Sequence, residues 1–154
     1  MVKLYIPKYE DLWFREKFMS DIDTMSYNNK WGGTIPFPKE HWKDWYDVWV
    51  LSDNKKCFYR YLINEDDEYI GEIAYHYDEE LKIYLLDVII YSKYRKKGYG
   101  KEGLNLLCEC AKENGIEYVY DNIAIDNKAI KLFLDNGFIE EYRNDEIIML
   151  KKKL

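Results

Sequence analysis

The stretch YSKYRKKGYGKEG, from Tyr91 to Gly103, decides how the rest of this sequence is interpreted. It holds five Lys and Arg residues and a single acid, Glu102, although the whole chain has 29 Asp and Glu against 23 Lys and Arg. It directly follows an apolar run, Ile83 to Ile90, and precedes a segment with helical periodicity. A basic, glycine-bearing segment between a strand and a helix predicts a binding site for an anion.

The helix that follows is predicted from about Gly100 to Asn114, and its start explains the basic charge. A helix N-terminus exposes unpaired N–H groups and carries a partial positive charge, so acidic side chains are favoured there. Here basic residues precede the helix instead, and Lys101 lies in its first turn. Gly98 and Gly100 allow several backbone N–H groups to turn toward one point. The pattern predicts a phosphate-bearing ligand, and the alternative is a solvated lysine-rich loop.

Two common nucleotide-binding motifs fit this stretch less well. The sequence lacks the G-x-x-x-x-G-K-[ST] pattern of a P-loop. Gly98, Gly100 and Gly103 satisfy the spacing G-x-G-x-x-G, but the strand before them belongs to a predicted antiparallel meander rather than to a βαβ unit. The spacing alone therefore does not predict a dinucleotide fold.

Strand and helix signals on both sides of this stretch predict an α+β protein. Before it, three segments with period-two alternation, Cys57–Ile63, Tyr69–Tyr77 and Lys82–Tyr91, are joined by short polar turns, which is typical of a meander. After it we expect a strand from Tyr118 to Ile125 and a helix from Lys128 to Asn136. Two final strands are expected near Phe138–Tyr142 and Glu146–Lys151.

The N-terminal third shows a strand, a helix and a long irregular stretch. We expect a strand from Val2 to Ile6, a helix from Asp11 to Ser20, and no regular structure from Asp21 to Phe37. A helix from Pro38 would place four aromatic residues on one stripe: Trp42, Trp45, Tyr46 and Trp49. The stripe faces the core or a second copy of the chain, or it lines a substrate pocket.

Length and composition predict one intracellular domain, residues 1–154. No apolar run is long enough for a membrane span, and the start resembles no secretion signal, so we expect a cytoplasmic protein without a membrane partner. The three cysteines have the spacing of neither a zinc site nor a disulfide framework, so no metal is expected. The net charge of −6 argues against nucleic acid and leaves room for a cationic small partner.

The residues from Arg95 to Gly100, RKKGYG, resemble the R/Q-x-x-G-x-G/A signature of the GNAT superfamily of acetyl-coenzyme A-dependent N-acetyltransferases. The flanking strand and helix, the strand after them, and the segment AIKLFLDNGF, Ala129–Phe138, occur in the family's order. The resemblance covers roughly residues 69–138, and residues 1–50 would form the acceptor side. It implies a central mixed, mostly antiparallel sheet of about six or seven strands flanked by about four helices.

The resemblance also implies which residues contact acetyl-coenzyme A (acetyl-CoA). The pyrophosphate would lie on backbone amides of the signature, and the pantetheine arm would extend along the preceding strand, where an amide near Ile90 would polarise the thioester carbonyl. The positions that the resemblance assigns to the cofactor are Val88, Ile89, Ile90, Arg95, Lys96, Lys97, Gly98, Tyr99, Gly100, Lys101, Asn127 and Phe133. Asn127 is one residue away from the family's usual asparagine position, which holds Asp126.

Asp87 is the first candidate for a catalytic base, because it interrupts the apolar run from Ile83 to Ile90. IYLLD, ending at Asp87, also looks like the corresponding strand of diamine acetyltransferases, where acids face the amine, although one acid of that pattern is Leu86 here. A structural carboxylate is the alternative. Glu72 and His76 lie on one face of the neighbouring strand, and each is either a base or acceptor contact or a surface residue.

The family's usual general acid is a tyrosine four residues before a G-F pair, and that position is Phe133 here. Tyr84, Tyr99 or a water molecule could give the proton to the thiolate in place of that tyrosine. Alternatively, the thiolate could leave without a proton donor. In the irregular N-terminal stretch, Tyr27, Asn28, Trp31 and Gly33 are predicted to shape the acceptor pocket, because long glycine-bearing loops in compact domains are often functional. A plain surface connection is the alternative.

Together these features predict a bacterial N-acetyltransferase that acts by direct attack in a ternary complex. The acceptor would be a primary amine of a polyamine-like molecule, an aminoglycoside, an amino acid or a protein N-terminus. The tryptophan stripe leaves room for a homodimer. Two other interpretations are a non-catalytic acyl-CoA sensor of the same fold, which Phe133 favours, and a nucleotide-binding interaction module.

Overall fold

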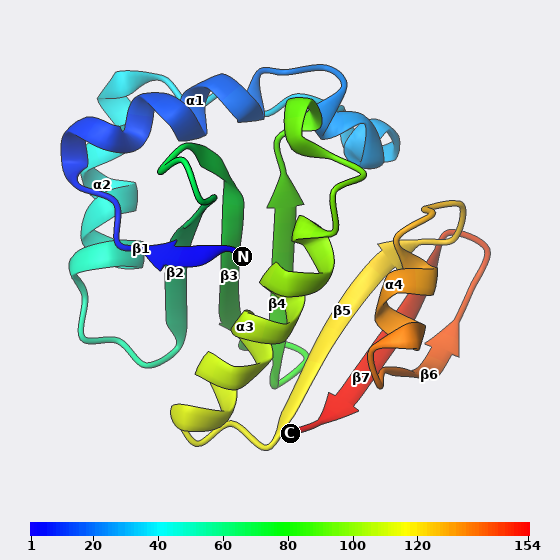
Figure 1. Cartoon of the computed structure of the whole chain (residues 1–154). Coiled ribbons are helices and arrows are strands. Elements are labelled where there is room, and N and C mark those ends of the chain that lie inside the picture. The colour runs from blue at the N-terminus through cyan, green and yellow to red at the C-terminus, as the bar shows by residue number, and fades with distance from the viewer.

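A computed structural model describes all residues from Met1 to Leu154, and its central feature is one mixed sheet of seven strands in the order β1-β2-β3-β4-β5-β7-β6 (Figure 1). The strands are β1 (Lys3–Tyr5), β2 (Cys57–Ile63), β3 (Tyr69–Asp78), β4 (Ile83–Ile90), β5 (Tyr118–Ala124), β6 (Ile139–Arg143) and β7 (Ile147–Lys153). All neighbours are antiparallel except β4 and β5. The expected α+β architecture with its mostly antiparallel sheet is confirmed.

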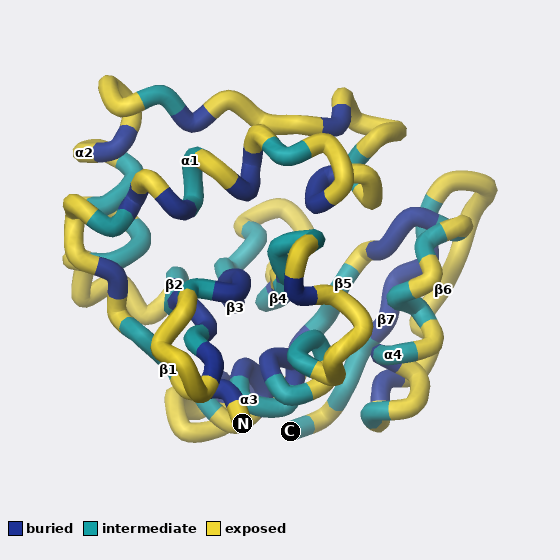
Figure 2. Tube along the Cα trace, turned by 45° about the horizontal axis from the view of Figure 1, so that its top comes forward, coloured by how far each residue is buried: buried dark blue, intermediate teal, exposed yellow.

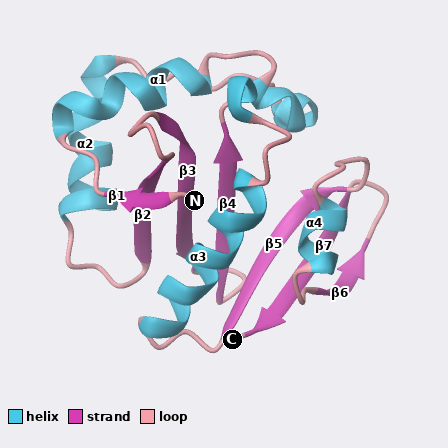
Figure 3. Cartoon of the chain, in the orientation of Figure 1, coloured by secondary structure: helices cyan, strands magenta, loops and turns pink.

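Helices cover both faces of this sheet (Figure 3). The α-helices are α1 (Trp13–Met19), α2 (Trp42–Tyr46), α3 (Tyr99–Glu113) and α4 (Ile130–Asp135). Four 3₁₀ segments and one π turn accompany them: η1 (Tyr9–Leu12), η2 (Thr24–Trp31), η3 (Lys39–His41), η5 (Ser92–Tyr94) and the π turn η4 (Asp47–Leu51). No helix in the structure has both the length and the apolar composition that crossing a bilayer requires.

Two sequence-based expectations about local structure need correction. The stretch from Asp21 to Phe37 is not wholly irregular, because η2 occupies eight of its residues. The helix expected from Pro38 is broken into η3, α2 and η4. Pro38 itself is extended and lies just before η3, consistent with its fixed backbone angle and missing N–H group.

Each face of the sheet has its own apolar core, because side chains along a strand alternate between the two faces (Figure 2). The α3-side core includes Leu62, Ile73 and Leu86 from the sheet and Leu104 and Leu107 from α3. Helix α3 lies close to the sheet because it presents Gly103: a Cβ atom there would be only 2.8 Å from Leu62 Cδ1. The α1-side core includes Phe14 and Phe18 from α1, Met25 from η2, and Tyr59 and Ile89 from the sheet.

The parallel strands β4 and β5 pair over a very short length, and this positions the site. Leu85 opposite Tyr120 is their single registered pair, near the start of both strands. Beyond it the two strands diverge toward their C-terminal ends (Figure 1). The second half of β4, from Asp87 to Ile90, therefore has no paired neighbour on the β5 side, and a gap opens between the strands.

Candidate active site

The basic loop at the start of α3 presents a run of backbone N–H groups. Lys96 and Gly98 both have left-handed backbone conformations, with φ of 63° and 83°. The N–H groups of residues 96–101 make no hydrogen bond within the chain, and the first helical bond runs from Glu102 N to Gly98 O at 3.2 Å. Unpaired amides at a helix start, beside exposed lysines, fit the phosphates of a nucleotide-bearing cofactor.

The side chain of Arg95 turns away from these amides. Its guanidinium donates hydrogen bonds to the carbonyl oxygens of Asp23, at 2.9 Å, and Thr24, at 2.7 Å. Asp21 strengthens this junction by accepting bonds from Thr24 and from the Ser92 hydroxyl, which also lower the pKa of the Asp21 carboxyl. The first residue of the basic signature therefore ties the cofactor loop to η2, while its backbone lies at the edge of the phosphate loop.

The predicted pantetheine residues lie where β4 leaves β5. Tyr91 N donates to Ile70 O in β3, so the antiparallel alternation directs the N–H and C=O groups of Val88 and Ile90 away from β3, toward the gap. The side chain of Ile89 is buried in the α1-side core, and Val88 and Ile90 pack against the α3-side core. These backbone N–H and C=O groups can form hydrogen bonds with an extended ligand that lies along the strand edge.

The candidate base Asp87 lies in a cross-strand row on the α1 side of the sheet. Tyr59 in β2 is opposite Ala74 in β3, and Ala74 is opposite Asp87 in β4. Glu72 and His76 lie two residues to either side of Ala74, so both are diagonal neighbours of Asp87. The structure thus brings together the predicted acidic residues of β3 and β4.

Glu72 is fully buried, which excludes the surface position considered for it. Its carboxylate accepts a hydrogen bond from the Tyr59 hydroxyl, and Arg15 Nε lies 3.4 Å from Glu72 Oε2. The guanidinium of Arg15 lies 4.5 Å and 4.4 Å from the ring centres of Phe37 and Trp45. Burial raises the pKa of Glu72, and the charge of Arg15 opposes that rise. Glu72 is thus held by partners and does not face a ligand.

Asp87 is exposed to solvent, although many protein atoms lie around its carboxyl group. This surrounding protein is the main reason that its pKa is raised from 3.8 to about 7, and the negative charge of Glu72 adds to the rise. The charge of Arg15 acts in the opposite direction. A carboxylate with a pKa near neutrality is suited to accept a proton at physiological pH.

Asp121 in β5 is a functional candidate that the sequence analysis missed. Burial raises its pKa well above the ordinary value, and the charge of Asp87 on the neighbouring strand raises it further. The signal in the sequence was the same as for Asp87, an acid inside an otherwise strand-like run, YVYDNIA.

Of the four residues predicted for the acceptor loop, Tyr27 is the one whose hydroxyl is influenced by the carboxyl cluster. Burial and the charges of Asp87, Glu72 and Asp121 raise the pKa of its hydroxyl, while Arg15 lowers it. Asn28 instead holds the loop together, because its Nδ2 donates to Gly33 O at 2.8 Å. Gly33 has φ of 72° and is buried, and Trp31 is exposed on the surface of η2.

His76 and Tyr84, the other two residues predicted for catalysis or acceptor binding, lie on opposite faces of the sheet. Burial lowers the pKa of His76, whose ring packs edge-on against Trp49 with 5.9 Å between ring centres. The side chain of Tyr84 lies on the opposite face from Asp87, where it packs on Tyr75 and Tyr77. The structure therefore does not bring Tyr84 to the carboxyl cluster.

The two family positions in the second half of the chain have structural partners. Phe133 is buried and packs edge-on against Phe138, with 4.9 Å between ring centres. Asn127 Oδ1 accepts a hydrogen bond from Ala129 N at 2.8 Å, just before α4. Helix α4 begins at Ile130, two residues later than the expected start at Lys128.

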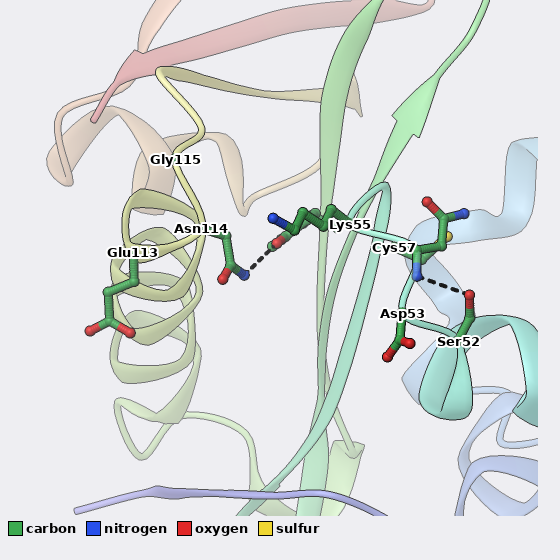
Figure 4. Close-up of a pocket in the computed structure, with 9 residues that line it drawn as sticks. Ser52, Asp53, Lys55, Cys57, Glu113, Asn114 and Gly115 are labelled. Atoms are coloured by element: carbon green, nitrogen blue, oxygen red, sulfur yellow. Dashed lines mark hydrogen bonds between the residues drawn. The ribbon is translucent and has the colours of Figure 1, made fainter.

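Two surface pockets lie at the other end of the sheet, near the C-terminus of α3. One has a volume of about 440 Å³ and lies between Asn114 and the turn around Lys55 (Figure 4). Its neighbour, of about 370 Å³, is lined by tyrosines that include Tyr84 and Tyr120. Neither pocket contains Asp87 or the basic loop, so we assign the candidate active site by its chemistry, at the gap between β4 and β5.

Comparisons with known proteins show the family and the fold of this chain. A family model described as acetyltransferase (GNAT) family matches residues 12–138. No curated protein matches the sequence. A spermidine N-acetyltransferase from Vibrio cholerae in complex with CoA and spermine is 17% identical with a TM-score of 0.77, covering 99% of this chain and 95% of that one.

Two further solved structures have the same fold. A PaiA N-acetyltransferase from Thermoplasma acidophilum in complex with coenzyme A is 16% identical with a TM-score of 0.71, covering 100% of this chain and 99% of that one. A GNAT-family acetyltransferase from Bacillus anthracis is 16% identical with a TM-score of 0.72, covering 99% of this chain and 93% of that one.

Proposed function

Because this chain belongs to the acetyltransferase (GNAT) family, we propose that it acetylates a primary amine of a cationic small molecule. Acetyl-CoA is the acetyl donor and supplies an activated thioester. The amides of residues 96–101 would hold its phosphates, and the backbone of Val88 and Ile90 would hold its pantetheine arm. The enzyme is proposed to be bacterial and cytoplasmic.

The single observation that carries the choice of acceptor is Asp87 at the mouth of the gap, with a pKa of about 7. An alkylamine is protonated at neutral pH and must lose a proton before it attacks an acyl carbon. The Asp87 carboxylate can attract the ammonium group and then accept that proton. The negative charge of Glu72 also acts on Asp87, against the opposing charge of Arg15, and an acidic group at this place favours a cation over an anion.

Direct attack by the amine is proposed over an acetyl-enzyme intermediate. Burial raises the pKa of the thiols of Cys57, Cys108 and Cys110, so none of them favours the reactive thiolate. The role of this chain is then to bind both substrates at one time, to exclude water from the gap and to accept the proton of the amine at Asp87.

A polyamine-like acceptor is the first choice within this class. The structural neighbour from Vibrio cholerae is a spermidine N-acetyltransferase, and the net charge of −6 here is compatible with a polycation. An aminoglycoside, an amino acid and a protein N-terminus are the other acceptors that a panel has to contain.

The test is release of the coenzyme A thiol from acetyl-CoA with spermidine, an aminoglycoside, an amino acid and a short peptide as acceptors. Turnover with a cationic small amine is the expected result. Turnover with the peptide alone would contradict the small-molecule proposal. A matched experiment measures the melting temperature with acetyl-CoA, coenzyme A, ATP and NADH, because a ligand at 100 times its dissociation constant adds about 2.7 kcal/mol.

One observation favours a second candidate function, a non-catalytic acyl-CoA sensor. Phe133 occupies the position of the family's usual tyrosine, and its buried ring has no hydroxyl. A melting-temperature rise with acetyl-CoA and no turnover with any amine would favour the sensor. A homodimer through the aromatic residues around α2 is a separate proposal, and light scattering that gives the monomer mass of 18.8 kDa would contradict it.

A further inference from the structure

The segment η2 is fastened at both ends across the open end of the gap. At its start, Thr24 Oγ1 accepts from Ser92 N at 2.9 Å, and Thr24 O accepts from Arg95 at 2.7 Å, so it is tied to the residues that follow β4. Near its end, Lys30 Nζ lies 3.7 Å from Asp126 Oδ1, directly after β5. Segment η2 therefore bridges the two diverging strands where their separation is greatest (Figure 1).

Tyr27 lies midway between these two anchors. A 3₁₀ helix has three residues per turn, so Thr24, Tyr27 and Lys30 lie above one another on a single side. Thr24 and Lys30 both turn this side toward the strand ends, because their partners are Ser92 and Asp126. Tyr27 is consequently directed toward the gap, which agrees with the influence of Asp87, Glu72 and Asp121 on its hydroxyl.

The two other tyrosines considered for the general acid lie elsewhere. Tyr84 lies on the opposite face of the sheet, and the charges that act on Tyr99 come from Glu65 and Glu102, beyond the start of α3. Phe133, at the position where the family has its acid, carries no hydroxyl. The Tyr27 hydroxyl, in contrast, is influenced by the charges of Asp87, Glu72 and Asp121.

We propose that Tyr27 is the catalytic hydroxyl that donates its hydrogen to the departing sulfur of coenzyme A, in place of the tyrosine that position 133 lacks. Arg95 is a positioning residue that acts through its two hydrogen bonds to η2. This inference rests on the proposed acetyl transfer, because it assigns a role within that same site.

The proton balance is complete without another reactant. Asp87 takes the first proton of the ammonium group, and the nitrogen lone pair then forms the bond to the acetyl carbon. As the carbon–sulfur bond breaks and its electron pair stays on sulfur, Tyr27 gives its hydrogen to the sulfur and receives the second proton of the nitrogen. The phenol is neutral before and after this exchange, as its carboxyl surroundings require. Asp87 finally releases its proton to water.

The first test needs no amine acceptor. The ionisation of the coenzyme A thiol is followed by ultraviolet absorption in the complexes of the wild type and Tyr27→Phe, with desulfo-coenzyme A complexes as baselines. The charged groups that influence the Tyr27 hydroxyl, which are Asp87, Glu72, Asp121 and Arg15, are the same in both proteins. We expect the ionisation constant of the bound thiol to fall about tenfold or more in Tyr27→Phe, because a hydrogen bond to the thiolate is lost. Superimposable titrations would overturn the proposal.

The second test is turnover, with Tyr84→Phe as the matched control, because Tyr84 lies on the opposite face of the sheet. We expect Tyr27→Phe to lower kcat about a hundredfold, with both Michaelis constants within about threefold of the wild type, and Tyr84→Phe to keep the wild-type rate. An unchanged kcat in Tyr27→Phe would also overturn the proposal. If the wild type acetylates no amine but its thiol titration still changes in Tyr27→Phe, the result contradicts the proposed function and not the contact between Tyr27 and the sulfur.

Arg95→Met tests the anchor. The substitution removes both hydrogen bonds from residue 95 to η2. We expect it to change the thiol titration in the same direction as Tyr27→Phe, but by a smaller amount. The variant should still bind coenzyme A to saturation. A titration identical to that of the wild type would show that Arg95 does not position Tyr27.

Discussion

Arg15 and Glu72 form an ion pair in the interior of the protein, with 3.4 Å between Nε and Oε2, and both side chains are largely inaccessible to solvent. Glu72 is a diagonal neighbour of Asp87 on the adjacent strand. Its negative charge raises the pKa of Asp87, and the charge of Arg15 lowers it. The basicity of the candidate base therefore depends on a buried pair that does not itself face the gap.

Replacing Asp87 by Asn is expected to lower kcat by about two to four orders of magnitude, because the amine loses its proton acceptor. In the wild type the rate should rise with pH through about 7, where Asp87 ionises, and this rise should disappear in Asp87→Asn. Rates measured between pH 5 and 9 test both statements. A variant that keeps the wild-type rise would show that another group is the base.

The same substitution should increase stability at neutral and higher pH. The pKa of Asp87 is raised in the folded state, so between its ordinary value of 3.8 and about 7 the folded state binds more protons than the unfolded state. Folding stability contributed by this group is therefore lost as pH rises through that range. The melting temperature of Asp87→Asn relative to the wild type should increase from pH 4 to pH 8. A constant difference would contradict the raised pKa.

Glu72→Gln should destabilise the fold and shift the pH profile at the same time. Removing one partner of a buried ion pair costs about 3–5 kcal/mol, because the charge of Arg15 is left without compensation. The pKa of Asp87 should fall, since the charge that raised it is gone, and the rise of kcat should move to lower pH. Chemical denaturation and a pH–rate profile measure the two effects.

Tyr59→Phe is the matched control for this variant. It removes the hydroxyl that donates to Glu72 but keeps the negative charge. Its pH profile should therefore stay close to that of the wild type, and a shift as large as that of Glu72→Gln would refute the electrostatic explanation.

Gly98→Ala should weaken acetyl-CoA binding. Gly98 has φ of 83°, a conformation that costs an L-residue about 1–2 kcal/mol, and no atom lies within 4 Å of an added Cβ, so the backbone alone is affected. Gly115→Ala is a close control, since Gly115 has φ of 84° and equally open surroundings but lies after α3. Both variants should lose similar stability, and the Michaelis constant for acetyl-CoA should rise in Gly98→Ala alone. Equal constants in the two variants would contradict a phosphate site at this loop.

Two glycines of α3 should respond in opposite ways to alanine. A Cβ at Gly103 would lie 2.8 Å from Leu62 Cδ1, inside a filled core, so Gly103→Ala should cost about 1–3 kcal/mol. At Gly100 the nearest atom, Leu132 Cδ2, is 3.5 Å away, which is ordinary contact. Gly100→Ala should therefore leave stability unchanged or raise it slightly, because alanine is the better helix former. Denaturation midpoints of the two variants check the contrast.

The sequence by itself determined those features that depend on neighbouring residues. Period-two alternation predicted the strands of the meander, and the apolar stripe of Leu104 and Leu107 predicted α3, because each pattern records which side chains are buried along one element. The phosphate loop was also predictable, since the basic residues, the two glycines and the helix start are contiguous. The RKKGYG signature added the family.

Only the tertiary structure decided how distant segments meet at the gap. The short parallel pairing at Leu85 and Tyr120 makes β4 and β5 diverge and brings Asp121 within the electrostatic influence of Asp87, which no single strand reveals. The burial of Glu72 depends on Arg15 from α1, and the alternation within β3 could not show that a helix covers this face. Arg95 was predicted to serve the cofactor, but the hydrogen bonds of its side chain reach η2, some 70 residues earlier. These relationships arise from sheet register and packing between elements, whereas the sequence pattern records only the environment of each element.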